Sequence, residues 1–246
     1  MSEPLISVRD VTVGWNDQVL LRSASFDVER GDVFVILGGS GSGKSTLLRY
    51  LIGLETPLSG TISIAGIGAP RLEGAAPEFG VMFQSGALFS SMTVGENVGF
   101  ALQEWTELPA EAVNAIVNAK LALVGLEGAE NKLPAELSGG MKKRAAIARA
   151  MAFEPSLIFL DEPSAGLDPV SAAELDDLIT ALNRGLGLTV VMVTHELESI
   201  FKVGKSCIML DRESKTIIAS GNPRQLKAES ADPKVRQFFL REARVR

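Results

Sequence analysis

A glycine-rich segment, residues 38–46 with the sequence GGSGSGKST, constrains the fold of this chain more than any other feature. It matches the pattern G-x-x-x-x-G-K-[S/T] and lies between an apolar run at Val33–Leu37 and a segment of helical character at Ser45–Ile52. Glycines allow the backbone N–H groups of such a loop to point at phosphate oxygens, and the start of a helix adds positive partial charge. We therefore predict a strand, a phosphate-binding loop and a helix in succession. The alternative, a flexible glycine-rich turn, does not explain the strand and the helix on either side.

The predicted loop assigns roles to two side chains. Lys44 is expected to reach the β- and γ-phosphates of a nucleotide, and the Ser45 hydroxyl is expected to bind Mg²⁺. The residues predicted to bind the nucleotide in this loop are Gly38, Gly39, Ser40, Gly41, Ser42, Gly43, Lys44, Ser45 and Thr46.

A second apolar run, Leu157–Leu160, ends in two carboxylates, Asp161 and Glu162. A buried strand of a parallel sheet would deliver both to the carboxyl end of the sheet, where ligands of such sheets bind. We expect Asp161 to hold Mg²⁺, directly or through water, and Glu162 to polarise the attacking water as a general base. The alternative is a solvated acidic turn, which would be preferred if the phosphate loop were absent.

His195 is the only histidine and follows a third apolar run, Leu188–Val193. A place at the end of a strand would bring it to the same edge of the sheet, where it could donate a hydrogen bond to the γ-phosphate. The alternative is a structural histidine.

Residues 137–141, with the sequence LSGGM, open a predicted helix in which Ser138 is a good N-cap. Gly139 and Gly140 leave the start of this helix bare, which favours binding of an anion. Three interpretations stay open at this point: a second anion site, a surface that completes the nucleotide site of a neighbouring molecule, or a glycine-rich helix start without a ligand.

The remaining pattern predicts an α/β architecture. Residues 5–30 alternate apolar and polar side chains, which indicates antiparallel strands. Residues 92–150 indicate three helices, at Val94–Glu104, Ala110–Val124 and Gly139–Ala152, with no convincing strand between them.

Single residues mark where some of these helices begin and end. Pro109 suits the start of the second predicted helix, and Gly125 suits its end. Ser171 and Glu174 have the spacing of a capping box ahead of a further helix.

Composition limits the partners of the chain. Its 246 residues include 24 Lys and Arg against 30 Asp and Glu, a net charge of −6, which argues against a general affinity for nucleic acid. The single cysteine, Cys207, makes no intrachain disulfide and fits a reducing compartment. Mean hydropathy is +0.20, yet no run of about 18 apolar residues and no secretory signal pattern is present. We therefore expect the chain to work at a membrane only through a partner.

The motifs occur together in the order found in the ATP-binding subunits of ABC transporters, and the chain resembles that family over residues 5–222. The resemblance implies an α/β fold with a P-loop NTPase (RecA-like) core, an antiparallel β subdomain and an α-helical subdomain inserted at about residues 92–150. It rests on residues 38–46, Gln84 after the strand Gly80–Phe83, residues 137–140, residues 157–162, residues 164–168 (SAGLD) and His195.

The family resemblance also implies a homodimer of ATPase subunits arranged head to tail. Two ATP molecules would lie between the phosphate loop of one subunit and Ser138, Gly139 and Gly140 of the other, which favours the second of the three interpretations above. Gln84 would contact Mg²⁺ and the attacking water, and Asp168 would run along the dimer seam. Trp15 matches the aromatic residue that stacks on adenine; a half-buried strand aromatic is the alternative.

A narrower resemblance concerns the ATPases of MCE-associated, Mla-type phospholipid transporters. It rests on residues 84–89 (QSGALF), residues 92–98 (MTVGENV) and Met141, whereas residues 161–168 have the form common to the whole superfamily. It implies a membrane permease and an MCE lipid-binding protein as partners, and a peripheral place on the cytoplasmic side of the inner membrane of a diderm bacterium. The alternatives are an ABC importer or exporter for another small molecule, and an ABC ATPase of nucleic-acid repair or translation.

Two surfaces each allow two interpretations. The apolar side chains of Leu88, Phe89 and Met92 would form a cleft for a permease helix or would pack inside the helical insert. The tail at residues 223–246 is basic, and Val235 and Phe239 lie on one of its helical faces with Phe238. It would dock on the acidic body of the partner ATPase, or would form a solvated terminal helix.

Overall fold

The computed structural model describes residues 3–15, 18–71 and 76–240. These residues form two compact units. The first unit combines the chain up to Leu72 with the chain from Thr189 onward, and the second unit is Glu73–Leu188.

One sheet of the first unit is antiparallel and has the strand order β2-β1-β4. It confirms the antiparallel strands predicted for residues 5–30. The inward side chains of its first strand, such as Val8, Val11 and Val13, are fully buried, as the alternating pattern requires. The strands are β1 (Ile6–Trp15), β2 (Gln18–Val28) and β4 (Ser59–Ile64), of which β4 was not predicted.

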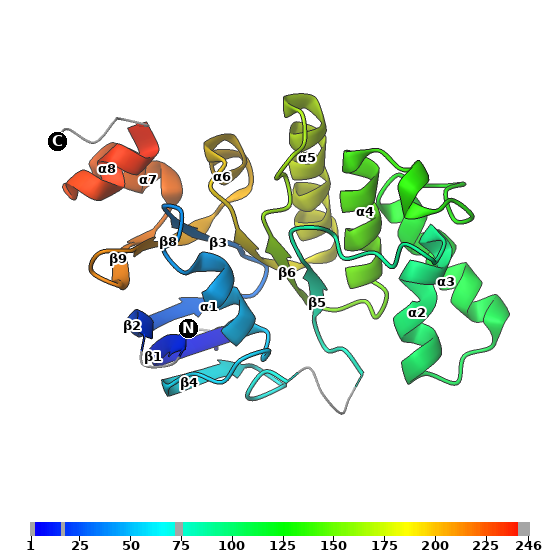
Figure 1. The fold of residues 1–246 in the computed structure, drawn as a ribbon, viewed down its shortest axis with the longest axis horizontal. Helices are drawn as coiled ribbons and strands as arrows, with labels where there is room; N and C mark the ends of the chain where they lie inside the picture. The colour runs from blue at the N-terminus through cyan, green and yellow to red at the C-terminus, as the bar shows by residue number, and fades with distance from the viewer. Residues whose placement is uncertain (1–2, 16–17, 72–75, 241–246) are drawn as a thin grey trace. The chain divides into compact units, whose positions relative to one another are not determined.

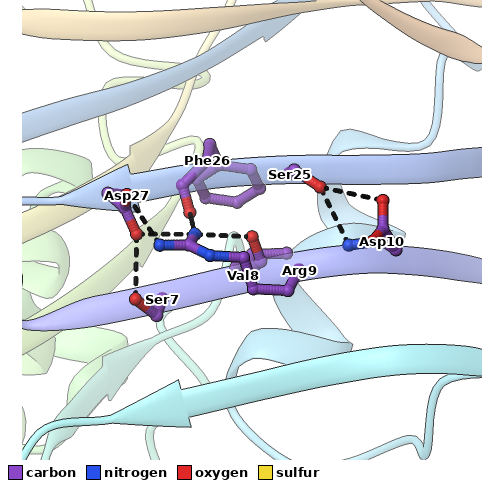
Figure 2. A network of polar contacts seen from close by, with 7 residues as sticks. All are labelled: Ser7, Val8, Arg9, Asp10, Ser25, Phe26 and Asp27. Atoms are coloured by element: carbon purple, nitrogen blue, oxygen red, sulfur yellow. Dashed lines mark hydrogen bonds and ion pairs between the residues drawn. The ribbon is translucent and has the colours of Figure 1, made fainter.

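The polar side chains of the alternating pattern contact one another across β1 and β2, as Figure 2 shows. The Arg9 guanidinium lies 2.7 Å from Oδ1 of Asp27, and Ser7 Oγ donates to the same carboxylate. The hydrogen bond from Arg9 is the main reason why the pKa of Asp27 is lowered. Further along the pair, the backbone N–H of Asp10 donates to Ser25 Oγ at 2.8 Å. Cross-strand contacts of this kind fix the register of the two strands.

The other strands of the first unit pair in the order β7-β3-β8-β9. β3 runs parallel to β7 and β8, and β9 is antiparallel to β8. Every residue of β3 and β7 is buried, which explains their continuous apolar runs and confirms the two strands predicted there. The bounds are β3 (Val33–Gly38), β7 (Thr189–Val193), β8 (Ser206–Asp211) and β9 (Thr216–Gly221).

Four helices are described in the first unit: α1 (Lys44–Leu51), α6 (Leu197–Val203), α7 (Pro223–Glu229) and α8 (Pro233–Leu240). The last of them lies in the basic tail. Val235 and Phe239 of α8 are buried, with the Phe239 ring 5.6 Å from that of Phe201. Lys234 Nζ lies 2.7 Å from Asp211 and 2.8 Å from Glu213. The apolar face of α8 is therefore covered by this chain itself, which excludes a fully solvated terminal helix, and docking of the basic tail on a partner ATPase stays a prediction.

The second unit joins two parallel strands to a group of helices. β5 and β6 pair so that Met82 lies beside Leu160, which confirms the predicted strand at 157–160. The helices α2, α3 and α4, drawn in green in Figure 1, confirm the three helices predicted between 92 and 150. The elements are β5 (Gly80–Met82), α2 (Val94–Trp105), α3 (Ala110–Leu123), the 3₁₀ helix η1 (Pro134–Glu136), α4 (Gly139–Ala150), β6 (Leu157–Asp161) and α5 (Pro169–Leu186).

The ends of these helices agree with the sequence signals in all but one case. Pro109 precedes α3, and Gly125 follows it with a φ of 70°. The capping box predicted at Ser171 is wrong, because α5 begins earlier, at Pro169. Its N-cap is Asp168, whose carboxylate accepts from the backbone N–H groups of Val170 and Ser171.

Across the described ranges, no helix is both long enough and apolar enough to cross a bilayer.

Candidate functional site

The phosphate loop connects β3 to α1 in the first unit. Gly38 ends β3 with a φ of 146°, and a Cβ there would lie 2.5 Å from Ser42 Oγ and 2.6 Å from the carbonyl oxygen of Leu210. Gly43 is the N-cap of α1 with a φ of 94° and no side-chain capping hydrogen bond. The first N–H groups of α1 therefore face the loop without a competing side chain, an arrangement that suits an anion.

Lys44 is the first residue of α1 and lies beside the loop. Its Nζ donates to the carbonyl oxygens of Gly38 at 3.0 Å and Gly39 at 3.2 Å, and the residue is buried. These contacts hold the ammonium group at the loop that would receive the phosphates. Ser45 and Thr46 follow in the first turn of the same helix.

Trp15 and His195 also belong to the first unit. Trp15 is the last residue of β1 and is 44% exposed, which agrees both with a half-buried strand aromatic and with a ring that has a free face for adenine. His195 follows β7, and its side chain is 57% exposed, with Nε2 3.5 Å from Glu196 Oε1. The side chain is therefore accessible to a ligand, and its catalytic role stays a prediction.

In the second unit, parallel pairing brings Gln84 and Asp161 to one place. Both residues line an open cavity of about 570 Å³ at the carboxyl ends of β5 and β6, together with Phe83, Ser85 and Gly166. The structure thus supports the inference that neighbouring strand ends converge. An amide oxygen and a carboxylate oxygen are ligands that suit Mg²⁺.

Glu162 directly follows β6 in an unusual backbone conformation. Its φ is 46°, in the left-handed region, and the residue is only 7% exposed. A non-glycine residue in this region costs about 1–3 kcal/mol and persists only where surrounding contacts over-determine it. Such strain is found most often at functional sites, which agrees with the role expected for this carboxylate.

One residue that holds these segments was not predicted. Lys143 of α4 donates from Nζ to the backbone carbonyl oxygen of Gln84 and, at 3.4 Å, to that of Glu162. Burial lowers the pKa of Lys143, and the charges of Asp161 and Glu162 oppose that shift. The sequence could have indicated a buried role for Lys143, because it lies one helical turn after Gly139, on the side of α4 that carries apolar residues.

Two further side chains fix the chain that follows Gln84. Arg149 of α4 donates to the carbonyl oxygens of Gly86 at 3.0 Å and Ala87 at 2.6 Å. Asn97 of α2 is fully buried and bonds both the N–H and the carbonyl oxygen of Phe89. The sequence analysis assigned no role to either side chain.

Leu88, Phe89 and Met92 belong to this fixed segment. Phe89 is 46% exposed, and its ring lies 5.3 Å from that of Phe100, while Leu88 and Met92 are half-buried. Packing inside the helices therefore does not account for Phe89.

The predicted anion surface at the start of α4 has the expected cap. Ser138 Oγ accepts from the backbone N–H of Met141 at 3.3 Å. A Cβ at Gly139 would lie 3.3 Å from Leu167, and one at Gly140 would lie 3.6 Å from Ser171. The glycines thus also allow α4 to lie close to the segment that caps α5.

Asp168 lies in that segment and is exposed. Its carboxylate accepts from the Ser171 hydroxyl at 2.6 Å, the main cause of its lowered pKa. Its local role is to begin α5. The phosphate loop, Trp15 and His195 thus belong to the first unit, and the other predicted site residues to the second.

Comparison with known proteins adds independent information. The family described as "ABC transporter" matches residues 21–165. The chain is 41% identical over 240 residues to the "Intermembrane phospholipid transport system ATP-binding protein MlaF" of Escherichia coli (strain K12), which covers 96% of this chain and 88% of that protein. It is also 41% identical over 239 residues to the "Probable ribonucleotide transport ATP-binding protein mkl" of Mycobacterium leprae (strain TN), covering 95% of this chain and 68% of that protein.

Solved structures agree on the fold. CbiO1 from Clostridium perfringens, part of the ABC transporter complex cbiONQ, superposes with a TM-score of 0.81 at 29% identity, covering 93% of this chain and 92% of that one. A dimeric post-hydrolysis state of the ATP-binding cassette MJ0796 bound to ADP and Pi gives a TM-score of 0.77 at 28% identity, covering 88% and 98%. The predicted α/β fold class is confirmed.

Proposed function

This chain belongs to the ABC transporter family, as an ATP-binding and ATP-hydrolysing subunit, and on that premise we propose that it powers the movement of phospholipid between the membranes of a diderm bacterial envelope. The substrate class is supported by the near full-length similarity to the Escherichia coli subunit named for intermembrane phospholipid transport. The motif at residues 84–98 supports the same choice.

The phosphate loop is the main support for ATP binding. Its glycines and the uncapped start of α1 supply backbone N–H groups for phosphate oxygens, and Lys44 supplies a positive charge beside them. Trp15 stacks on the adenine, a contact worth about 0.5–1.5 kcal/mol.

The residues fit a magnesium ion. Ser45, Gln84 and Asp161 all offer oxygen ligands, and the last two line one open cavity. Bound Mg²⁺ supplies positive charge to the β- and γ-phosphate oxygens.

Glu162 orients the attacking water and accepts its proton at the side-chain carboxylate. His195, exposed at the end of β7, donates a hydrogen bond to the γ-phosphate. Loss of that phosphate removes the contact.

The catalytic unit is a head-to-tail homodimer. Ser138, Gly139 and Gly140 present the bare start of α4 to the nucleotide held by the phosphate loop of the other subunit, and Asp168 lies along the seam. The dimeric cassettes among the structural relatives support this arrangement. ATP closes the dimer because it binds the closed state more tightly, and hydrolysis allows reopening.

Membrane partners complete the transporter. The exposed Phe89, with Leu88 and Met92, receives a helix of an integral membrane permease. An MCE lipid-binding protein accepts or delivers the lipid. The chain thus works as a peripheral protein on the cytoplasmic side of the inner membrane.

The general base is tested with Glu162→Gln, which keeps the size of the side chain and removes its ability to accept a proton. We expect ATP affinity close to that of the wild type and a fall in kcat of about 100-fold or more. Wild-type hydrolysis in this variant would contradict the role of Glu162.

The substrate is tested with the complex purified from the membrane. Mass spectrometry of the complex should find bound phospholipid and an MCE-type subunit, and vesicles containing the complex should move phospholipid in an ATP-dependent manner. Transport of ribonucleotide instead, as the name of the mycobacterial relative states for that protein, would reject the lipid assignment while keeping the ATPase.

A further inference from the structure

Lys143 contacts two segments that the proposed mechanism treats separately. Its Nζ donates to the backbone carbonyl oxygens of Gln84 and Glu162, which follow β5 and β6. One residue of α4 thus bridges the chain that carries the metal-binding amide and the chain that carries the general base.

Joining two strands through a buried ammonium group costs desolvation free energy. Lys143 is 7% exposed, and removing a charge from water costs free energy unless hydrogen bonds and opposite charges compensate. The opposite charges here belong to Asp161 and Glu162. A charged donor to carbonyl oxygens makes stronger hydrogen bonds than a neutral one, and of the two contacts the one with Gln84 is the shorter.

Both bridged segments need external restraint. Glu162 has a φ of 46°, a conformation that neighbouring contacts must impose. The segment after Gln84 passes through Gly86 and Ala87, both with positive φ, and is held there by Arg149. Lys143 and Arg149 both lie on α4, so this helix fixes the Gln84 segment at two points and Glu162 at a third.

We propose that Lys143 is a positioning residue for ATP hydrolysis: it fixes the backbone of Gln84 relative to that of Glu162, and so sets the distance between the amide and the carboxylate that act on the water. This inference rests on the proposed function. It concerns the chemical step and not the binding of ATP, because the phosphate loop lies in the other unit.

The test compares Lys143→Met with Lys120→Met. Lys120 is also 7% exposed and also bonded, at 2.7 Å to Glu154, but touches neither Gln84 nor Glu162. Both variants lose a buried ammonium group, so both are expected to lower Tm. Only Lys143→Met should lower kcat, by about 10- to 100-fold, because small displacements of catalytic groups have effects of this size. ATP affinity, measured by calorimetry, should stay within about twofold in both variants, because neither lysine takes part in phosphate binding.

Lys143→Arg tests the bridge itself, because a guanidinium can donate to both carbonyl oxygens. It should recover a substantial part of kcat. If Lys143→Met does not fold, Lys143→Gln replaces it, since the amide keeps N–H donors.

Equal kcat values in Lys143→Met and Lys120→Met would overturn the inference. So would a loss of ATP affinity that accounts for the whole defect. Absence of hydrolysis in the wild-type protein would instead reject the proposed function, so the two failures are distinguishable.

Discussion

Substitution of Asn97 tests how the second unit holds the segment at residues 89–93. The side chain is fully buried on α2 and makes four hydrogen bonds to the chain at residues 89–93. Its Oδ1 accepts from the N–H of Phe89 at 2.7 Å. Its Nδ2 donates to the carbonyl oxygens of Phe89, Met92 and Thr93 at 3.1, 3.1 and 2.9 Å.

Asn97→Ala removes all four contacts of the side chain with these part-buried backbone groups. A hydrogen bond contributes about 1 kcal/mol, so the loss amounts to roughly 3–4 kcal/mol. For a chain of this size that corresponds to a fall in Tm of roughly 10 °C. Asn97→Asp keeps the acceptor for Phe89 but turns a negative oxygen toward three carbonyl oxygens. It should be at least as destabilising at pH 7, and less so when acid protonates the new carboxyl group.

The assay is guanidinium unfolding of each variant, with Asn131→Ala as the matched control. Asn131 is exposed, and its Nδ2 reaches only Glu130, at 3.5 Å, so its removal should cost less than about 0.5 kcal/mol. If Asn97→Ala were no less stable than Asn131→Ala, the four hydrogen bonds would not hold the segment, and the argument would fail. Chymotrypsin cleavage near Phe89 should rise in parallel with the loss of stability.

Two other predictions use the first unit. Gly38→Ala should lower ATP affinity by at least about 10-fold in calorimetry, because its Cβ would clash with neighbours at 2.5 and 2.6 Å and its φ is 146°. Gly185→Ala, where a Cβ meets nothing within 4 Å, should bind ATP normally. Burial opposes ionisation of Asp211, but hydrogen bonds, chiefly from Lys234, lower its pKa to about 2. Ionised Asp211 therefore stabilises the fold above about pH 4, and this contribution is lost as pH falls toward 2. Lys234→Met should flatten the pH dependence of the urea midpoint over that range; an unchanged slope would contradict the pairing.

Sequence was informative in most places where one physical requirement dominated, although the buried apolar run of β8 was not predicted. Strands buried on both faces need continuous apolar runs, and these runs located β3, β6 and β7. The phosphate loop was recognisable because few other structures need that glycine spacing. β9 was missed because its residues are half-exposed, with neither a run nor an alternation to mark it.

The errors at the site have a different cause. The Ser171 box was plausible locally, but Asp168 followed by Pro169 makes a stronger helix start three residues earlier. Lys143 and Asn97 were passed over because charged and amide side chains in helices are usually solvated. Their partners are backbone carbonyl oxygens from other segments, which no single-sequence pattern displays.

The packing of α8 limits which substitutions this chain can accumulate during evolution. The family match ends at residue 165, and the motifs end at His195, so the terminal helix looks dispensable from sequence alone. Yet Val235 and Phe239 are buried, and the Phe239 ring packs against that of Phe201, which lies on the helix that follows that histidine. Substitutions at these three apolar positions should therefore be rare and mutually compensating among descendants of this sequence. Of the two basic residues of this helix, the exposed Arg236 can vary freely, whereas Lys234 is held by its ion pairs with Asp211 and Glu213.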